Sequence, residues 1–267
     1  MKYGFVFPRE HGLIAFWLAS LYLSLFTFIT LGKIVPVDQR PIRFSYFILA
    51  IIYSIIVIFS YGSIKNLVKS KFKKIEKIPI IILILFTIIL LVLKPINELY
   101  WIFITIGLLS IIWGFLCIQT KKVNYNEIGV GILILSLHYP IIMVFTLGDI
   151  DNFPIQQIMA IWWIFTGIAN ATSIRVGSLR GRISHHQPLI RTFLFLISTI
   201  PLFSLNITHP IFILLMIEPI YQNILQWKRK PSIKESKLSI RKIGLNLILS
   251  LSASLILFSI CIHQQFK

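Results

Sequence analysis

The feature that most constrains this chain is a series of apolar runs, each about as long as a membrane-spanning helix. Residues 78–93, IPIIILILFTIILLVL, carry no charged side chain at all. A helix that crosses a bilayer needs about 20 predominantly apolar residues. Charged residues make up only 13% of the chain, whereas soluble domains contain about 25%. The sequence therefore predicts a membrane protein.

Helices are expected rather than strands. A backbone in lipid must satisfy its own hydrogen bonds, and the strands of a membrane barrel would alternate apolar and polar residues, which these runs do not. The sequence predicts an all-α, polytopic transmembrane helix bundle that forms a single domain over residues 1–267. Nine spans are expected, at about 13–32, 44–62, 78–93, 99–118, 128–147, 155–173, 189–206, 210–227 and 243–262.

The distribution of basic residues predicts the orientation, because cytosolic loops are enriched in lysine and arginine. With a cytoplasmic N-terminus, 21 of the 26 basic residues face the cytosol and the C-terminus lies outside. This places the protein in the cytoplasmic (inner) membrane. Anionic lipid headgroups account for the net charge of +17, so membrane lipids are the expected partners and nucleic acid is not. The five basic residues on the outer side are Lys33, Arg40, Arg43, Lys94 and Lys267.

The first candidate site is FPREHG, residues 7–12, at the entrance to the first span. Pro8 suits the first turn of a helix, and the helix dipole favours the negative charge of Glu10 there. Next to it stands His11, and histidine is the side-chain type that ordinarily titrates near neutral pH. Arg9, Glu10 and His11 together suggest a ligand site. The alternative is an interfacial anchor in which the arginine reaches the headgroups.

The second candidate site is NATSIRVGSLRGRISHHQ, residues 170–187. We expect Asn170 to lie at the end of the sixth span, and Arg175 and Arg180 to follow in a loop that Gly177 loosens. Arginine binds phosphate and carboxylate through two parallel hydrogen bonds, which lysine cannot do. The loop at 65–77 uses only lysine, so this contrast favours an oxyanion site. The alternative is that these arginines only help to set the orientation of the chain in the membrane.

Two polar side chains lie inside predicted spans, His138 in the fifth and Glu218 in the eighth. A charge at the bilayer centre costs about 2.5–3.5 kcal/mol on insertion scales, so such residues should face the bundle interior. One interpretation is a hydrogen bond between helices, from Glu218 to His138 or Asn170. The other is a pair that binds a ligand or moves protons.

Other chemistry is not predicted. The segment GDIDNFP, residues 148–154, is expected to be a solvated acidic turn. The adjacent His185 and His186 point to different faces of a helix, so no metal site is expected. The chain lacks the nucleotide-binding and hydrolase motifs, and no cofactor is predicted.

Three segments resemble the YwiC-like family of bacterial integral membrane proteins. They are PREHG at residues 8–12, ATSIRVGSLRGR at 171–182 and IRKIGLNLILSLS at 240–252. In relatives the first motif is expected to run into Ala-Trp, whereas here Leu13-Ile14 follow. An acidic residue is expected near Asn246 and is missing. The resemblance implies a multi-pass membrane protein, and the family has no established activity.

The predicted topology is also similar to that of UbiA-type prenyltransferases, which hold a prenyl diphosphate through magnesium. Their Asp-rich motifs follow the second and sixth helices. The corresponding segments here have no such motif, and only Asn66 and Asn170 stand in comparable places.

We therefore expect a cytosolic-side pocket for an anionic lipid or a phosphorylated isoprenoid. The residues expected to form it are Arg9, Glu10, His11, Asn170, Arg175 and Arg180. Two alternatives stay open: a UbiA-like transferase without the magnesium motifs, and a small-solute transporter whose path is lined by His138 and Glu218. Whether the chain is an enzyme is left open by the sequence.

Overall fold

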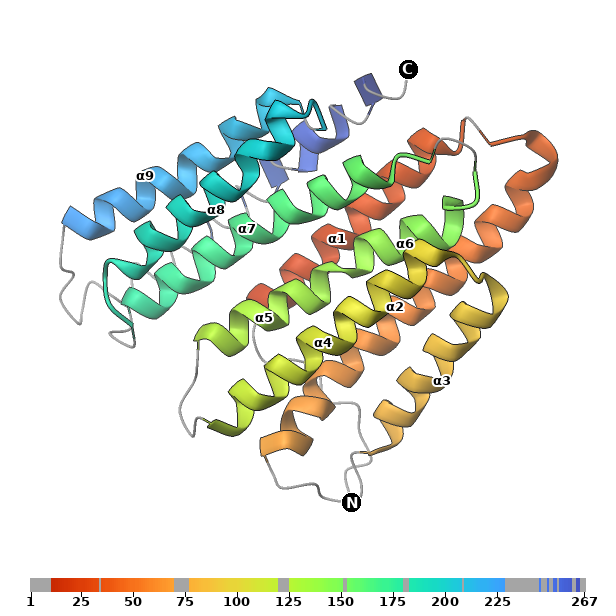
Figure 1. Cartoon of the computed structure of the whole chain (residues 1–267), viewed down its shortest axis with the longest axis horizontal. Helices are drawn as coiled ribbons and strands as arrows, with labels where there is room; N and C mark the ends of the chain where they lie inside the picture. The colour runs from red at the N-terminus through yellow and green to blue at the C-terminus, as the bar shows by residue number, and fades with distance from the viewer. Residues whose placement is uncertain are drawn as a thin grey trace. The chain divides into compact units, whose positions relative to one another are not determined.

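The computed structural model is mainly helical over the residues that it describes, with no strand among them (Figure 1). These are residues 11–33, 35–69, 77–119, 125–150, 153–179, 183–207 and 209–228, and residues 245, 249, 252, 253, 255–260, 263 and 264. The chain divides into two compact units, Met1–Ile155 and Gln156–Lys267, which are described separately. We call them unit 1 and unit 2.

The helices of unit 1 are α1 (His11–Leu31), the short 3₁₀ helix η1 (Val37–Gln39), α2 (Arg40–Lys69), α3 (Lys77–Leu93), α4 (Asn97–Gln119), α5 (Tyr125–Ser136) and α6 (His138–Leu147). Those of unit 2 are α7 (Ile155–Leu179), α8 (Gln187–Ser204), the 3₁₀ helix η3 (Pro210–Ile213) and α9 (Leu214–Lys228).

Four helical segments in the described part are long and apolar enough to cross a membrane: Val37–Tyr61, Asn97–Leu116, Ile128–Leu147 and Gln187–Ser204. They correspond to the predicted spans 44–62, 99–118, 128–147 and 189–206. Two shorter apolar helices, Phe16–Leu31 and Ile78–Leu93, correspond to the predicted first and third spans.

The other predicted spans have less support. Those at 155–173 and 210–227 fall on α7 and on η3 with α9, which are not among the four candidates. Too few residues are described in 243–262 to give the first and last residues of a helix there. The count of nine spans and the orientation of the termini therefore stay predictions.

The outer faces of α3 and α4 are apolar. Val92 of α3 is 74% exposed and Trp101 of α4 is 69% exposed, with isoleucine, leucine and phenylalanine side chains along the same faces. Patches of this kind mark protein or membrane contacts, because a soluble monomer rarely exposes them. This agrees with the length and composition of the helices.

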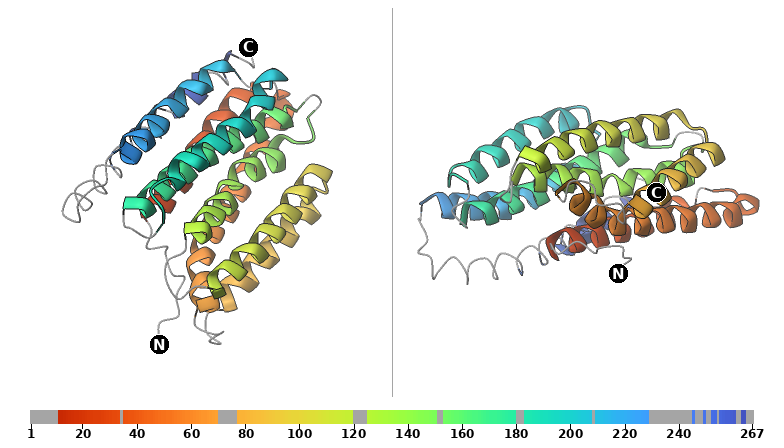
Figure 2. Two further views of the ribbon diagram at one scale, coloured as in Figure 1. Left: turned by 60° about the vertical axis from the view of Figure 1, so that its left-hand side comes forward. Right: turned by 90° about the horizontal axis from the view of Figure 1, so that it is seen from below.

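Helix α6 forms the core of unit 1. All its residues are buried, and it packs against α1, α2 and α4. The hydroxyl of Tyr139 lies 3.3 Å from Thr27 Oγ1 of α1, and the ring of Phe145 meets Tyr46 of α2 edge to face at 5.4 Å. Helix α3 lies at the edge of the unit beside α2, which both further views show (Figure 2).

A break separates α5 from α6 at Leu137. Pro140 has no N–H to give to the carbonyl of Ser136, and its ring crowds that carbonyl, so an unbroken helix is disfavoured there. At the break, the N–H of Leu137 is shared between the carbonyls of Leu133 and Ile134, both at 3.3 Å. As a result, His138 is the first residue of α6, in the middle of the candidate span Ile128–Leu147.

In unit 2, α7 and α8 approach closely at a glycine. The ring of Phe195 lies where a side chain at Gly167 would have to stand, and Trp163 Nε1 donates to Ser198 Oγ at 3.2 Å. Helix α8 is joined to α9 by Asn223, whose Nδ2 donates to Thr192 Oγ1 at 2.6 Å. Small and polar residues therefore join these helices.

The predicted end of the sixth span is wrong. Helix α7 continues to Leu179, so Arg175 and Gly177 lie within the helix and not in a loop. The hydroxyls expected near the helix end bond carbonyls of their own helix, Thr172 to Ile168 at 3.0 Å and Ser173 to Asn170 at 2.9 Å. Since those carbonyls and hydroxyls satisfy one another locally, nothing stops the helix there.

Candidate functional site

A cavity of about 140 Å³ lies among the helices of unit 1, and we call it the His138 cavity. Helices α2, α3, α4, α5 and α6 all contribute to its wall. The residues that line it are Tyr53, Val57, Tyr61, Ile64, Leu83, Ile106, Ser110, Trp113, Gly114, Ile134, His138 and Ile141. Most of these lie in candidate membrane spans, so the cavity lies inside the apolar part of the unit.

Two polar side chains of this wall have buried atoms without a hydrogen bond. Neither ring nitrogen of His138 has a partner, and the same is true of Trp113 Nε1. His138 is 2% exposed and Trp113 is 3% exposed. An unsatisfied buried donor or acceptor costs about 1–3 kcal/mol, so these atoms are retained at the expense of stability. A ligand that bonds them would recover that cost.

Aromatic side chains shape the cavity around these atoms. The ring of Tyr53 lies 6.3 Å from the ring of His138, and the ring of Tyr61 lies 5.1 Å from that of Trp113. The hydroxyl of Tyr61 lies over Gly131 of α5, at the point where a Cβ atom would stand. The glycine therefore lets Tyr61 pack against α5.

The wall at Gly114 is open. A Cβ built there meets no atom within 4 Å, and the same holds for Gly107, about two helical turns earlier on α4. Gly114 lines the His138 cavity, whereas Gly107 does not. A side chain at Gly114 would therefore begin in open space at the cavity, and Gly107 offers a control position on the same helix.

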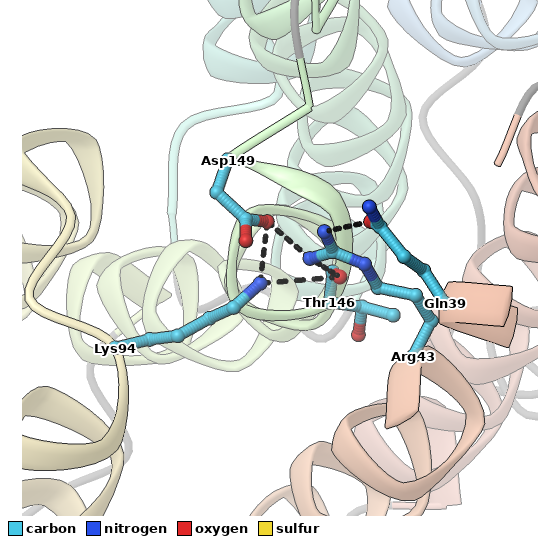
Figure 3. A network of polar contacts seen from close by, with 5 residues as sticks. All are labelled: Gln39, Arg43, Lys94, Thr146 and Asp149. Carbon is cyan, nitrogen blue, oxygen red and sulfur yellow. Dashed lines mark hydrogen bonds and ion pairs between the residues drawn. The ribbon is translucent and has the colours of Figure 1, made fainter. Parts of the chain in front are cut away.

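A second polar group lies at the end of unit 1 where α2 begins and α6 ends (Figure 3). We call it the Arg43 network: Gln39, Arg43, Lys94, Thr146 and Asp149. Arg43 Nη1 forms an ion pair with Asp149 Oδ1, and Lys94 Nζ donates to the same oxygen at 2.6 Å. One carboxylate thus holds α2 and the segment between α3 and α4 to the end of α6.

The last turn of α6 and η1 complete this network. Arg43 Nη1 also donates to the carbonyl of Thr146 at 3.2 Å, and Lys94 Nζ donates to it at 3.3 Å. Arg43 Nη2 donates to Gln39 Oε1 at 3.0 Å. The last carbonyls of a helix have no partner within it, and cations are favoured at that end. The network therefore stabilises the end of the central helix.

The charges of this network shift each other's pKa. Burial raises the pKa of the Asp149 carboxyl, but the hydrogen bonds from Arg43 and Lys94 and their charges lower it more, so that it lies below its ordinary value. Burial lowers the pKa of the Lys94 amine, and the charge of Arg43 adds to this. The hydrogen bond and charge of Asp149 oppose that shift without cancelling it.

The solvated acidic turn predicted at residues 148–154 agrees with Asp149, which lies in a turn with its side chain 42% exposed, but the two ion pairs of this carboxylate were not predicted. Asp151 and Asn152 of the turn lie outside the described residues. The network joins residues far apart in the sequence, so no local pattern reveals it. The one signal is that Arg43, Lys94 and Asp149 all lie at span ends on the predicted outer side, where charges are few.

The predicted site residues fall in different parts of the structure. Arg9, Glu10 and Arg180 lie outside the described residues, and His11 begins α1 without a described side chain. Asn170 is half-buried and Arg175 is buried, both on α7 of unit 2. Because His11 and Arg175 belong to different units, the composite pocket stays a prediction.

The two polar residues that the sequence places inside predicted spans fall in different units. His138 lies in α6 of unit 1, as described above. Glu218 lies in α9 of unit 2, and its side chain is outside the described part, so its predicted hydrogen bond is not tested. The rings of His185 and His186 lie 3.7 Å apart between centroids. Within the part of the chain that is described, no three His, Cys, Asp or Glu side chains lie together as a metal site would require.

A comparison with models of protein families found no match, and comparisons with curated proteins and with solved structures found none either.

Proposed function

We propose that the protein is a multi-pass protein of the cytoplasmic membrane, with nine spans and a cytosolic N-terminus, that binds a lipid-like ligand. The ligand class is an anionic lipid or a phosphorylated isoprenoid, and its apolar chain occupies the His138 cavity. The resemblance to the YwiC-like family is part of this proposal.

The observation that carries the proposal is the His138 cavity, with unsatisfied nitrogen atoms in a mostly apolar wall. A concave, mostly apolar pocket with a few polar groups is the usual form of a small-molecule site. The apolar wall suits a hydrocarbon chain. His138 and Trp113 offer hydrogen bonds to a polar atom on that chain or at its end, and bonding would remove the cost of burying them unpaired.

The same wall argues against the small-solute transporter. A path for a polar solute needs polar side chains along its length, whereas only a few of the residues around this cavity are polar. The UbiA-like transferase remains the alternative function, because such an enzyme also needs a cavity for an apolar tail.

The position of the cavity along α2 suggests where a phosphate would lie. The cavity extends from Tyr53 to Ile64, and α2 ends at Lys69. Lysines 65, 69, 71, 73, 74 and 77 follow in the sequence. With a cytosolic N-terminus this end of α2 faces the cytosol, so the chain of the ligand points into the membrane and its phosphate points to the basic segment.

Photolabelling tests this proposal directly. The purified full-length protein in detergent is irradiated with a diazirine-tagged farnesyl phosphate, and the labelled peptides are identified by mass spectrometry. We expect the label on cavity residues of α2, α4 and α6. Gly114→Leu should remove most of the labelling by filling the cavity, and Gly107→Leu on the same helix should leave it unchanged.

Other results would contradict the proposal. Labelling spread over the exposed faces of α3 and α4, and equal in the Gly114→Leu and Gly107→Leu variants, would mean general contact with lipid only. Release of diphosphate from a prenyl diphosphate in the presence of an acceptor, lost in Gly114→Leu, would favour the transferase.

A further inference from the structure

A second hollow, of about 200 Å³, lies in unit 1 where α1 ends and α2 begins. Arg40 and Arg43 line it together with Phe28, Ile29 and Phe44. It shares only Arg43 with the Arg43 network and no residue with the His138 cavity. It is therefore a separate feature of the unit, which we call the Arg40–Arg43 hollow.

Positive charge is in excess around this hollow. Arg43 and Lys94 share the single carboxylate of Asp149. Arg40 bonds a neutral acceptor, with Nε donating to the carbonyl of Val35 at 3.2 Å. The acid nearest in the sequence is Asp38, which is exposed on η1. Counted together, the three cations exceed these two acids, so an anion is attracted here.

Arg43 also has a donor that is not used. Its side chain is 8% exposed, and its Nε has no hydrogen-bond partner. Nearly every buried polar atom in a native protein is bonded, so such an atom indicates a missing partner. An arginine that lines a hollow with an unused donor is suited to phosphate, which it binds through several hydrogen bonds.

The remaining wall is apolar and open to the surroundings. Ile29 is 57% exposed and Phe44 is 55% exposed, while Phe28 stacks on Phe47 with ring centroids 4.4 Å apart. Phe44 lies in the candidate span Val37–Tyr61. Exposed hydrocarbon directly beside two arginines fits a molecule that has an acyl chain next to a negative headgroup.

We propose that the Arg40–Arg43 hollow binds the phosphate of an anionic phospholipid, with an acyl chain of that lipid lying along Ile29 and Phe44. The guanidinium groups bond the phosphate oxygens, and Asp149 holds Arg43 in place. This site lies at the opposite end of α2 from the lysine-rich segment, and it does not depend on the ligand proposed for the His138 cavity.

Native mass spectrometry of the full-length protein tests this site. Phosphatidylglycerol is titrated against the protein in detergent, and phosphatidylcholine is titrated as the neutral comparison. Arg40→Gln is the main variant, because Arg40 is exposed and its removal leaves the Arg43 network intact. Lys33→Gln is the matched control: Lys33 is an exposed cation next in sequence to Gly32 of the hollow, and it does not itself line it.

We expect Arg40→Gln to weaken the tightest phosphatidylglycerol binding by about fivefold or more, which is what one basic residue near a lipid surface contributes. Lys33→Gln should change it by less than about twofold, because Lys33 does not line the hollow. Phosphatidylcholine should bind more weakly than phosphatidylglycerol.

Three results would overturn the proposal. Equal effects of Arg40→Gln and Lys33→Gln would mean general surface attraction. Equal binding of the two lipids would mean that the net negative charge of the lipid is not recognised by this excess of cations. Displacement of phosphatidylglycerol by inorganic phosphate at the same concentration would mean a site for a small anion, with no role for the acyl chain.

Discussion

The two polar regions of unit 1 are built on the same helices and are satisfied to different degrees. Helices α2 and α6 supply Arg43 and Thr146 to the network at one end, and Tyr53 and His138 to the cavity. In the network a carboxylate, a carbonyl and an amide accept hydrogen bonds from the two cations, although Arg43 Nε and Thr146 Oγ1 have no partner. In the cavity neither nitrogen of His138 is bonded.

This difference separates stability from binding. A buried polar group that is bonded contributes to folding, and one that is left unbonded costs free energy until a ligand meets it. Substitutions in the network should therefore lower stability, and substitutions in the cavity should change ligand binding more than stability. Four measurements test this contrast, from the largest expected effect on stability to the smallest.

The largest effect is expected for Arg43→Leu. It leaves Lys94 and Asp149 paired but removes the bonds from α2 to the end of α6. Breaking a buried ion pair costs about 3–5 kcal/mol. Because Asp149 is half in solvent, we expect a loss of about 2–3 kcal/mol in the free energy of unfolding, measured by denaturant titration in detergent micelles.

The double variant Arg43→Leu with Asp149→Leu serves as the control. It removes the acid as well, so, if the ion pair is the cause, the double variant should lose less stability than the sum of the two single variants. A double variant as unstable as the sum of both single variants would show that the two residues act independently.

A smaller effect is expected for Gly131→Ala, which tests how tightly the cavity wall is packed. The new methyl group would meet the hydroxyl of Tyr61, whose ring is held against Trp113, so the ring must shift. We expect about 1–2 kcal/mol of destabilisation, as for other overpacked sites. Gly107→Ala meets no atom within 4 Å and should be neutral or slightly stabilising. Equal stability of both variants would show that the wall at Tyr61 is loose.

The change in stability expected for His138→Phe has the opposite sign. It replaces an unbonded buried imidazole with an apolar ring, so the ligand-free protein should be equally stable or about 1 kcal/mol more stable. Labelling by the farnesyl phosphate probe should fall at the same time. A clear loss of stability in the absence of ligand would mean that His138 has a structural role, and it would remove the contrast between the two regions.

The smallest effect is expected from pH, through Asp149. Its pKa in the folded protein lies below the ordinary value, so its contribution to stability is complete above about pH 4 and is lost as the pH falls through the folded-state pKa. The apparent melting temperature of the wild type should therefore fall more steeply below pH 4 than that of Asp149→Asn. Parallel curves for the two proteins would mean that Asp149 contributes nothing.

The sequence predicted the helical class and much of the arrangement along unit 1. The run 128–147 matches the candidate span Ile128–Leu147, because its end is marked by the start of a polar turn. The end of α7 was predicted about two turns too early. Hydroxyl groups near a helix end resemble capping residues in the sequence, and only their bonds to Ile168 and Asn170 show that the helix continues.

The candidate sites were predicted less well. His138 was identified because an ionisable residue inside an apolar run is rare, and it does line a cavity. The partners of that cavity, such as Trp113 and Tyr61, are ordinary aromatic residues of apolar helices and carry no local signal. Arg43, Lys94 and Asp149 were each assigned to separate loops. Only the packing of α6 between its neighbours brings them together.

The central position of α6 also has a consequence for biosynthesis. The helices that surround it, α1, α2 and α4, all precede it in the chain. Helix α6 is therefore synthesised after the helices against which it packs. Arg43 and Lys94 are synthesised before Asp149, so neither can form its ion pair until the end of α6 has been synthesised. Synthesis of Asp149 thus completes the Arg43 network. A nascent chain that ends before Asp149 therefore holds two cations of the Arg43 network without the carboxylate that pairs with both of them.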